Sequence, residues 1–160
     1  MPELPEVETT RRGIEPHVAG RTLTAVTVRE PRLRWPVDAR VAELRDRRII
    51  GLRRRAKYLL MDLGDLHLGI HLGMSGTLRV VAADTPLRKH DHIDLHLDSG
   101  QLLRFNDPRR FGALLYLTDA LTHPLLANLG PEPLDQDFSG GWLYRRSRGR
   151  RVSVKSFIMD

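Results

Sequence analysis

Residues 92–105 read HIDLHLDSGQLLRF, and this stretch says most about the fold class. Apolar and polar residues alternate as far as Leu97, a turn signal follows at Ser99 and Gly100, and a second apolar stretch begins directly after it. Alternation with a period of two is typical of a strand with one buried face, and such a short turn joins strands that run antiparallel. We therefore expect an antiparallel hairpin here.

The same pattern recurs on both sides of this hairpin, without helices between the strands. The expected strands are Thr22–Arg29, Arg47–Arg54, Tyr58–Leu63, Asp65–Leu72, Thr77–Val81, His92–Leu97, Gln101–Phe105 and Ala113–Leu117. Parallel sheets need long crossover connections, and the short turns here leave no room for them. The sequence predicts a mainly β fold, an antiparallel two-layer sandwich or barrel with flanking helices.

A helix is expected before the first strand. Pro5 suits the start of a helix, and Gly20 suits its end. Val7, Ile14 and Val18 fall on one stripe between them. This helix should pack by one face and hold the N-terminus in place.

The alternation stops after Leu117. Residues 119–128 and 139–148 have short helical patterns, and the turn sequence LGPEPL lies between them. We place a domain boundary near Leu134, with a β domain over residues 1–134 and a linker with the first part of a helical domain over residues 135–160.

Composition favours a nucleic-acid partner. The 160 residues carry 26 Lys and Arg against 20 Asp and Glu, a net charge of +6, and nearly all of the surplus lies in residues 141–160. An arginine-rich coding bias with a solubilising basic tail is the alternative. The absence of cysteine excludes a disulfide scaffold and a thiol nucleophile. Without a secretory signal or an apolar run of membrane-spanning length, we expect a soluble, cytoplasmic protein.

The N-terminal residues suit a specific chemistry. If Met1 is removed, Pro2 presents a secondary amine that is partly neutral near pH 7. Such an amine attacks an aldehyde-like carbon and gives a cationic iminium, with Glu3 and Glu6 near enough in sequence to transfer protons. A retained Met1 would make the Pro2 nitrogen an unreactive amide. The alternative is that Glu3 merely flanks a helix.

A cluster of cations lies in RRRAKYLL. On the expected strand, Arg53, Arg55 and Lys57 share one face and form a row that suits a phosphate backbone, or else an ordinary solvated face. Two loops add to this surface. HLGMSG displays Met74, and NDPRRFG displays Arg109 and Phe111, which suit the wedges and cations that replace an extruded base. A single Met or Phe in a loop is more often part of the core.

HDHIDLH offers a metal site as a further alternative. By parity His90, His92, Asp94 and His96 share one strand face, and imidazoles with a carboxylate can bind a metal ion. We disfavour this interpretation, because imidazoles on a solvent-facing or DNA-facing surface need no metal. We therefore expect no metal-ligating residues.

Taken together, these stretches resemble the bacterial formamidopyrimidine-DNA glycosylases. The matching motifs, in the family's order, are MPELPEVET, RRGIEPH, RRRAKYLL, HLGMSGTLR, KHDH, NDPRRFGA and LGPEPL, and the resemblance extends throughout residues 1–160. It implies a two-layer antiparallel β-sandwich with an N-terminal helix. It further implies a monomeric base-excision-repair glycosylase and abasic-site (AP) lyase that removes oxidised purines, such as 8-oxoguanine and formamidopyrimidines, from damaged double-stranded DNA.

The resemblance also implies catalytic roles for individual residues. Pro2 would be the Schiff-base nucleophile at the sugar C1′, and Glu3 the proton donor to the departing base or the sugar. Lys57 is similar to the lysine credited with proton donation in β-elimination and with gripping the phosphate beside the lesion. Glu6 joins this catalytic set because it lies close to Pro2 on the first helical turn, and not through the resemblance.

A second set of residues would bind DNA. Met74, Arg109 and Phe111 resemble the trio that fills the space left by the flipped nucleotide. His90, Arg109 and Arg150 stand where the family contacts phosphate or the opposite base.

Members of the family continue with a helix-two-turn-helix region and a zinc finger with four cysteines. This sequence has no cysteine, so the resemblance implies no cofactor in this chain and places the family's structural zinc outside it. We expect the chain to be the N-terminal catalytic part, with weak or no activity alone. A catalytically silent DNA-binding fragment and a small β-sandwich metalloprotein are the alternatives.

Overall fold

The computed structural model describes residues 2–119, 123–127, 129, 132 and 139–159. The chain forms two compact units, Met1–Ala127 and Asn128–Asp160. No helix of the described residues is long and apolar enough to cross a membrane.

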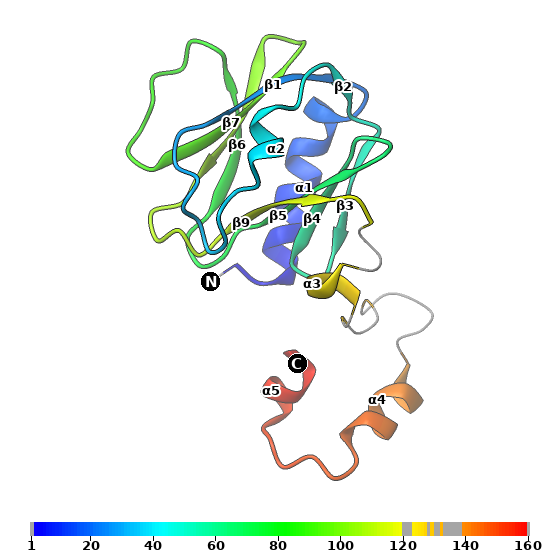
Figure 1. The fold of residues 1–160 in the computed structure, drawn as a ribbon. Coiled ribbons are helices and arrows are strands. Elements are labelled where there is room, and N and C mark those ends of the chain that lie inside the picture. The colour runs from blue at the N-terminus through cyan, green and yellow to red at the C-terminus, as the bar shows by residue number, and fades with distance from the viewer. Residues whose placement is uncertain (1, 120–122, 128, 130–131, 133–138, 160) are drawn as a thin grey trace. The chain divides into compact units, whose positions relative to one another are not determined.

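The larger unit consists of two antiparallel sheets, as predicted (Figure 1). One has the order β2-β1-β7-β8-β6, and the other has the order β3-β4-β5-β9. The strands are β1 (Thr22–Val28), β2 (Arg47–Arg48), β3 (Gly51–Arg55), β4 (Tyr58–Asp62), β5 (His67–His71), β6 (Thr77–Ala82), β7 (Asp91–Leu97), β8 (Gln101–Asn106) and β9 (Ala113–Leu117).

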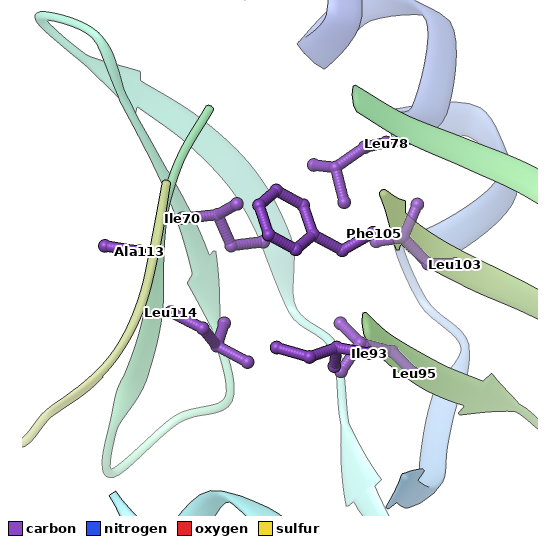
Figure 2. A pocket seen from close by; sticks show the side chains of 8 residues that line it. All are labelled: Ile70, Leu78, Ile93, Leu95, Leu103, Phe105, Ala113 and Leu114. Atoms are coloured by element: carbon purple, nitrogen blue, oxygen red, sulfur yellow. The ribbon is translucent and has the colours of Figure 1, made fainter. Parts of the chain in front are cut away.

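Apolar side chains from both sheets form the core. Figure 2 shows a small void among them, with Ile70 and Leu114 facing Ile93 and Phe105 from the other sheet. The void has a volume of about 10 Å³ and an apolar lining, which gives a water molecule no hydrogen-bonding partner. Around this void, the described side chains of the two sheets form packed core.

Helix α1 (Leu4–Val18) packs against strands of both sheets, namely β3 and β4 of one and β6 of the other. The predicted stripe of Val7, Ile14 and Val18 is buried. Glu3 and Glu6 form a capping box at the start of the helix, and Gly20 follows its end with a φ of +78°. Pro2 and Glu3, which precede α1, are thus held close to the sheets.

The predicted strand Arg47–Arg54 is wrong in one respect, because it is two strands in different sheets. Strand β2 pairs with β1, whereas β3 pairs with β4. The chain passes from one sheet to the other between two adjacent residues. The N–H of Ile49 donates to Arg21 O, whereas the N–H of Ile50 donates to Asp62 O. The alternating pattern continues through this crossing and does not reveal it.

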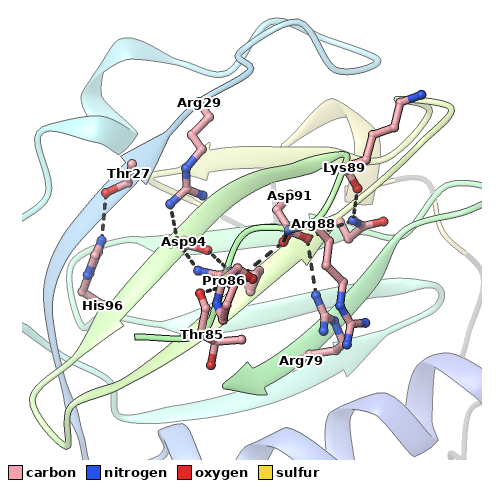
Figure 3. Close-up of polar contacts among 12 residues, drawn as sticks. Thr27, Arg29, Arg79, Thr85, Pro86, Arg88, Lys89, Asp91, Asp94 and His96 are labelled. Atoms are coloured by element: carbon pink, nitrogen blue, oxygen red, sulfur yellow. Dashed lines mark hydrogen bonds and ion pairs between the residues drawn. The ribbon is translucent and has the colours of Figure 1, made fainter. Parts of the chain in front are cut away.

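The predicted polar face of β7 is also not a solvent face. Asp94 is 1% exposed and His92 is 8% exposed. Asp94 accepts hydrogen bonds from Arg29 at 2.5 Å and from Arg104 Nε at 2.9 Å, and the Arg29 contact is visible in Figure 3. Parity placed these side chains on the outer face, but arginines from the neighbouring strands and the loop after β6 cover that face.

Short helices complete the described chain: α2 (Ala39–Ala42), α3 (Pro124–Ala127), α4 (Gly140–Ser147) and α5 (Val154–Met159). Of these, α4 matches the predicted segment 139–148, with Ser139 Oγ accepting from Trp142 N–H at 3.0 Å. The predicted segment 119–128 contains the shorter α3, whereas α2 and α5 were not predicted. The expected boundary near Leu134 lies outside the described residues.

Candidate functional site

Pro2 lies at an open cavity of about 900 Å³ in the larger unit. The cavity is lined by the start of α1, the turn before β6, strand β6 itself, the loop after it and the end of β8: Pro2, Glu6, Thr10, Leu72, Gly76, Thr77, Leu78, Arg79, Arg88, Lys89 and Asn106. Ligand pockets have volumes of about 300–1,000 Å³, so a group as large as a nucleotide fits here.

Glu3 and Lys57 meet beside Pro2. The Lys57 ammonium nitrogen lies 3.0 Å from Glu3 Oε2. The backbone N–H of Glu3 donates to Glu6 Oε2 at 2.5 Å, so the predicted acids Glu3 and Glu6 are joined to each other as well. The structure therefore brings Glu3, Glu6 and Lys57 into one connected group at the residue after Pro2.

The sequence did not indicate which element carries Lys57. It lies in the turn between β3 and β4, together with Ala56, and not on a strand face with Arg53 and Arg55. Ala56 adopts a φ of +50°, which tightens the turn. The predicted row of three cations on one strand face is thus wrong, because the chain reverses before Lys57.

Arg54 holds this turn against α1. Its guanidinium donates to Glu8 Oε2 at 3.0 Å and to the carbonyl of Ala56 at 3.0 Å. Hydrogen bonds from Arg11 and Arg54 lower the pKa of Glu8 to about 2, although burial opposes the shift. Glu8 is consequently a carboxylate at neutral pH and links the helix to the turn that carries Lys57.

His71 belongs to the same neighbourhood and was not predicted. Its ring packs edge-on against Tyr58 with centroids 4.8 Å apart, and its Nδ1 accepts from Gly73 N–H at 2.9 Å. Burial, together with the nearby cations Arg34 and Lys57, lowers the pKa of His71. The neutral ring therefore carries its proton on Nε2. The only hint in the sequence is the position of His71 at the start of HLGMSG.

The two predicted loops are locked together by one buried carboxylate. Asp107 Oδ1 accepts from the Ser75 hydroxyl at 2.7 Å, and its Oδ2 accepts from Gly112 N–H at 2.8 Å. Arg109 N–H in turn donates to Ser75 Oγ at 3.1 Å. Gly73 allows the loops to touch, because a Cβ there would lie 2.4 Å from the carbonyl carbon of Phe111.

The loops present the predicted wedge residues to solvent. Met74 is 40% exposed and Phe111 is 44% exposed, so neither is a core residue. The Arg109 guanidinium lies over the Phe111 ring, 5.1 Å from its centroid. The carbonyl of His90 accepts from Asp107 N–H at 3.1 Å, which attaches His90 to the same region. Met74, Arg109, Phe111 and His90 thus gather around Asp107.

Arg150 belongs to the smaller unit, where its guanidinium lies 5.5 Å from the centroid of the Phe157 ring.

The metal alternative finds no support in the described part of the chain, where no group of three or more His, Cys, Asp or Glu residues could hold an ion. The geometry explains this result. His92 Nε2 donates to the carbonyl of Asp107 at 2.8 Å, and Asp94 is held by two arginines.

Comparisons with known proteins identify the family of the chain. Residues 1–114 match the family model of the formamidopyrimidine-DNA glycosylase N-terminal domain. The chain is 67% identical over 160 residues to the formamidopyrimidine-DNA glycosylase of Alcanivorax borkumensis, covering 100% of this chain and 60% of the relative. It is 60% identical to that of Stenotrophomonas maltophilia strain K279a, again covering 100% of this chain and 60% of the relative.

Solved structures give the same result. The Lactococcus lactis enzyme bound non-covalently to DNA containing an AP site superposes with a TM-score of 0.88 at 32% identity, covering 99% of this chain and 62% of that one. The MutM protein of Thermus thermophilus gives a TM-score of 0.75 at 41% identity, covering 90% and 52%. The chain therefore spans about 60% of the length of the curated relatives it matches, and it belongs to the formamidopyrimidine-DNA glycosylase family.

Proposed function

We propose that the protein acts in base-excision repair as a DNA glycosylase and AP lyase, removing 8-oxoguanine and formamidopyrimidines through a Schiff base at Pro2. The proposal rests on the ion pair between Lys57 and Glu3, the residue after Pro2, together with a cavity at Pro2 that is large enough for a nucleotide. An amine nucleophile, a carboxylate and an ammonium group are the parts that such chemistry needs.

The first step is displacement of the base. The lone pair of the Pro2 nitrogen forms a bond to the sugar C1′, and the glycosidic bond breaks with its electron pair on the departing base. Glu3 supplies the proton to the base or the sugar. Since the N–H of Glu3 is tied to Glu6, the first residues keep one orientation while the bond forms.

Elimination requires the iminium, which forms when the sugar ring opens. The C1′–O4′ bond breaks with its electron pair on O4′, which takes up a proton, and the Pro2 nitrogen, having released its own proton, forms a double bond to C1′. The positive charge acidifies the C2′ proton, whose loss expels the 3′ phosphate in β-elimination. Loss of the C4′ proton then expels the 5′ phosphate in δ-elimination. Lys57 donates a proton in β-elimination and binds the phosphate beside the lesion. The Glu3 carboxylate, 3.0 Å away, holds the ammonium group in place until the phosphate arrives.

The loops around Asp107 support base extrusion. We infer that Met74 and Phe111 enter the space left by the flipped nucleotide, while Arg109 and His90 contact the opposite base or phosphate. Flipping costs a few kcal/mol, and apolar insertion offsets part of this cost. Asp107 holds both loops in one geometry before DNA binds, so little free energy is needed to order them.

We further propose that the partner is damaged double-stranded DNA, bound by a monomer in the bacterial cytoplasm. Residues 1–134 would form the catalytic domain, and residues 135–160, with Arg150, would begin a helical region that also contacts DNA. The structural zinc of the family would lie outside this chain, which has no cysteine.

A borohydride trapping experiment tests the proposal. The protein with Met1 removed is incubated with duplex DNA containing an abasic site and sodium borohydride, which reduces an imine to a stable amine. We expect a covalent adduct that mass spectrometry maps to Pro2. The control is the same protein with Met1 retained, whose Pro2 nitrogen is an amide and forms no adduct.

Failure of the Met-free protein to form an adduct, or an adduct on a lysine, would reject the Schiff base at Pro2. If no adduct forms at all, the catalytically silent DNA-binding fragment is the correct interpretation.

A further inference from the structure

The loop between β6 and β7, residues 83–90, is tied down by polar groups of the neighbouring strands (Figure 3). Arg104 donates to the carbonyls of Thr85 and Pro86 at 3.0 and 3.3 Å. At the far end of the loop, the buried carboxylate of Asp91 accepts from Arg88 N–H at 2.7 Å. The loop backbone is therefore held at several points although most of its side chains are exposed.

The groups that hold the loop are themselves fixed. Arg104 is buried and makes two hydrogen bonds to Asp94, at 2.9 and 3.1 Å. Asp91 is also bound by Arg79 Nη2 at 3.3 Å and by Asn106 Nδ2 at 2.9 Å, and the same Asn106 nitrogen donates to the carbonyl of Lys89 at 2.8 Å. Because every anchor has several partners, the loop keeps one conformation.

The side chains of Arg88 and Lys89 project from this fixed backbone. Both residues are exposed, and within the described part of the chain neither side chain has an acidic partner. Both also line the Pro2 cavity, together with Arg79, whose charge is already engaged by Asp91. Asp84 is the one acid on the loop, and it too is exposed. Two uncompensated cations therefore stand at one wall of the cavity.

We propose that Arg88 and Lys89 form a phosphate-binding site for the DNA strand whose nucleotide enters the Pro2 cavity. This inference rests on the proposed function and adds residues that the sequence did not single out. A guanidinium and an ammonium group are the side chains that bind phosphate most strongly, and a preformed loop loses little entropy on binding. The site lies on the wall formed by the loop, whereas Pro2 and Glu6 belong to the start of α1.

The test compares two variants that lose the same charge. Arg88→Gln with Lys89→Gln removes the proposed site. Arg21→Gln with Arg48→Gln removes two exposed cations near the opposite end of α1, which at 15 residues is about 22 Å long. Binding of a duplex with an abasic-site analogue is measured by fluorescence anisotropy between 50 and 200 mM salt.

Each phosphate contact adds about 0.9 to the slope of log affinity against log salt. Because Arg88 and Lys89 bind one phosphate, we expect the double variant to lose about 0.9 from this slope. Over the stated salt range, the affinity of the unmodified protein then falls about three- to fourfold more than that of the variant. The Arg21/Arg48 variant should keep the original slope. Equal slopes for all three proteins, or equal losses for both variants, would overturn the proposal.

Neutral methylphosphonate groups then locate the contact. They are placed one at a time at the phosphates flanking the abasic-site analogue. When the methylphosphonate replaces the contacted phosphate, the unmodified protein and the Arg88/Lys89 variant should bind with equal affinity. If the unmodified protein binds more tightly than the variant at every position tested, the proposed site is rejected. Borohydride trapping reports on Pro2 separately, so loss of the adduct with a normal salt slope rejects the proposed chemistry and not this site.

Discussion

The ammonium group of Lys57 lies 3.0 Å from the carboxylate of Glu3, and this ion pair joins the start of the chain to the turn between β3 and β4. Both side chains keep contact with solvent, so the pair adds little to stability. Its consequence is positional, since a carboxylate and an ammonium group are held together at the residue that follows Pro2. Substitutions of Glu3 and Lys57 should therefore be non-additive in catalysis.

Lys57→Met tests this arrangement. Removing a group that handles a proton lowers rates by a factor of about 10² to 10⁴, so we expect at least a hundredfold slower strand cleavage at an abasic site. The free energy of unfolding should change by less than about 1 kcal/mol. Gel-based cleavage and urea denaturation measure the two quantities. Arg48→Met is the control, and cleavage at the original rate by Lys57→Met would exclude the assigned role.

Asp107→Ala should separate the two loops that carry Met74 and Phe111. The substitution leaves the buried N–H of Gly112 without its acceptor and removes the partner of Ser75, which costs about 3 kcal/mol. Urea denaturation measures this loss. The exposed Asp84→Ala should stay within about 0.5 kcal/mol of the original stability. Comparable stability of the two variants would show that Asp107 does not hold the loops.

Gly73→Ala should be more damaging than Gly20→Ala. Both glycines have positive φ angles, +63° and +78°, which alanine adopts at a cost of about 1 kcal/mol. At Gly73 the added Cβ would also lie 2.4 Å from the Phe111 carbonyl carbon, whereas nothing lies within 4 Å at Gly20. Melting temperatures give the comparison. Equal shifts in the two variants would mean that the loops do not touch at Gly73.

Acid stability should depend on Glu8. Its pKa in the folded protein is about 2, lowered from 4.5 by Arg11 and Arg54, so its contribution is complete above pH 4.5 and is lost as the pH falls towards 2. Glu8→Gln should therefore be less stable than the original protein at pH 6 and nearly equal to it at pH 2. Urea titrations at several pH values give both curves. Parallel curves down to pH 2 would contradict the role of this carboxylate.

The sequence predicts the strands well where one face of a sheet is buried, because alternation then reports burial directly. It does not predict the crossing at Ile49 and Ile50, since the alternation continues while the hydrogen bonds pass from one sheet to the other. It also misplaces Asp94, because parity assigns a face but not what covers that face. Arg29 covers Asp94 from one side, and Arg104 covers it from the other.

In the candidate site, too, the sequence indicates some residues and misses contacts that depend on packing. Chemistry and local sequence suggest Pro2, Glu3 and the loop residues Met74, Arg109 and Phe111 as candidates. The meeting of Glu3 with Lys57 depends on how α1 packs against β3, which no local pattern contains. His71 was missed for the same reason, because its neighbours Tyr58 and Lys57 come from an adjacent hairpin.

The anchoring of residues 83–90 has a consequence for folding. Loops of this length usually open independently of the sheets they connect, by local fluctuations that cost little free energy. Here the amide of Arg88 is bonded to a carboxylate that is itself buried between strands, and Arg104 grips the other end of the segment. Opening the loop therefore requires disrupting the side-chain hydrogen bonds of the sheet. The loop and the sheet consequently form one cooperative unit that unfolds together.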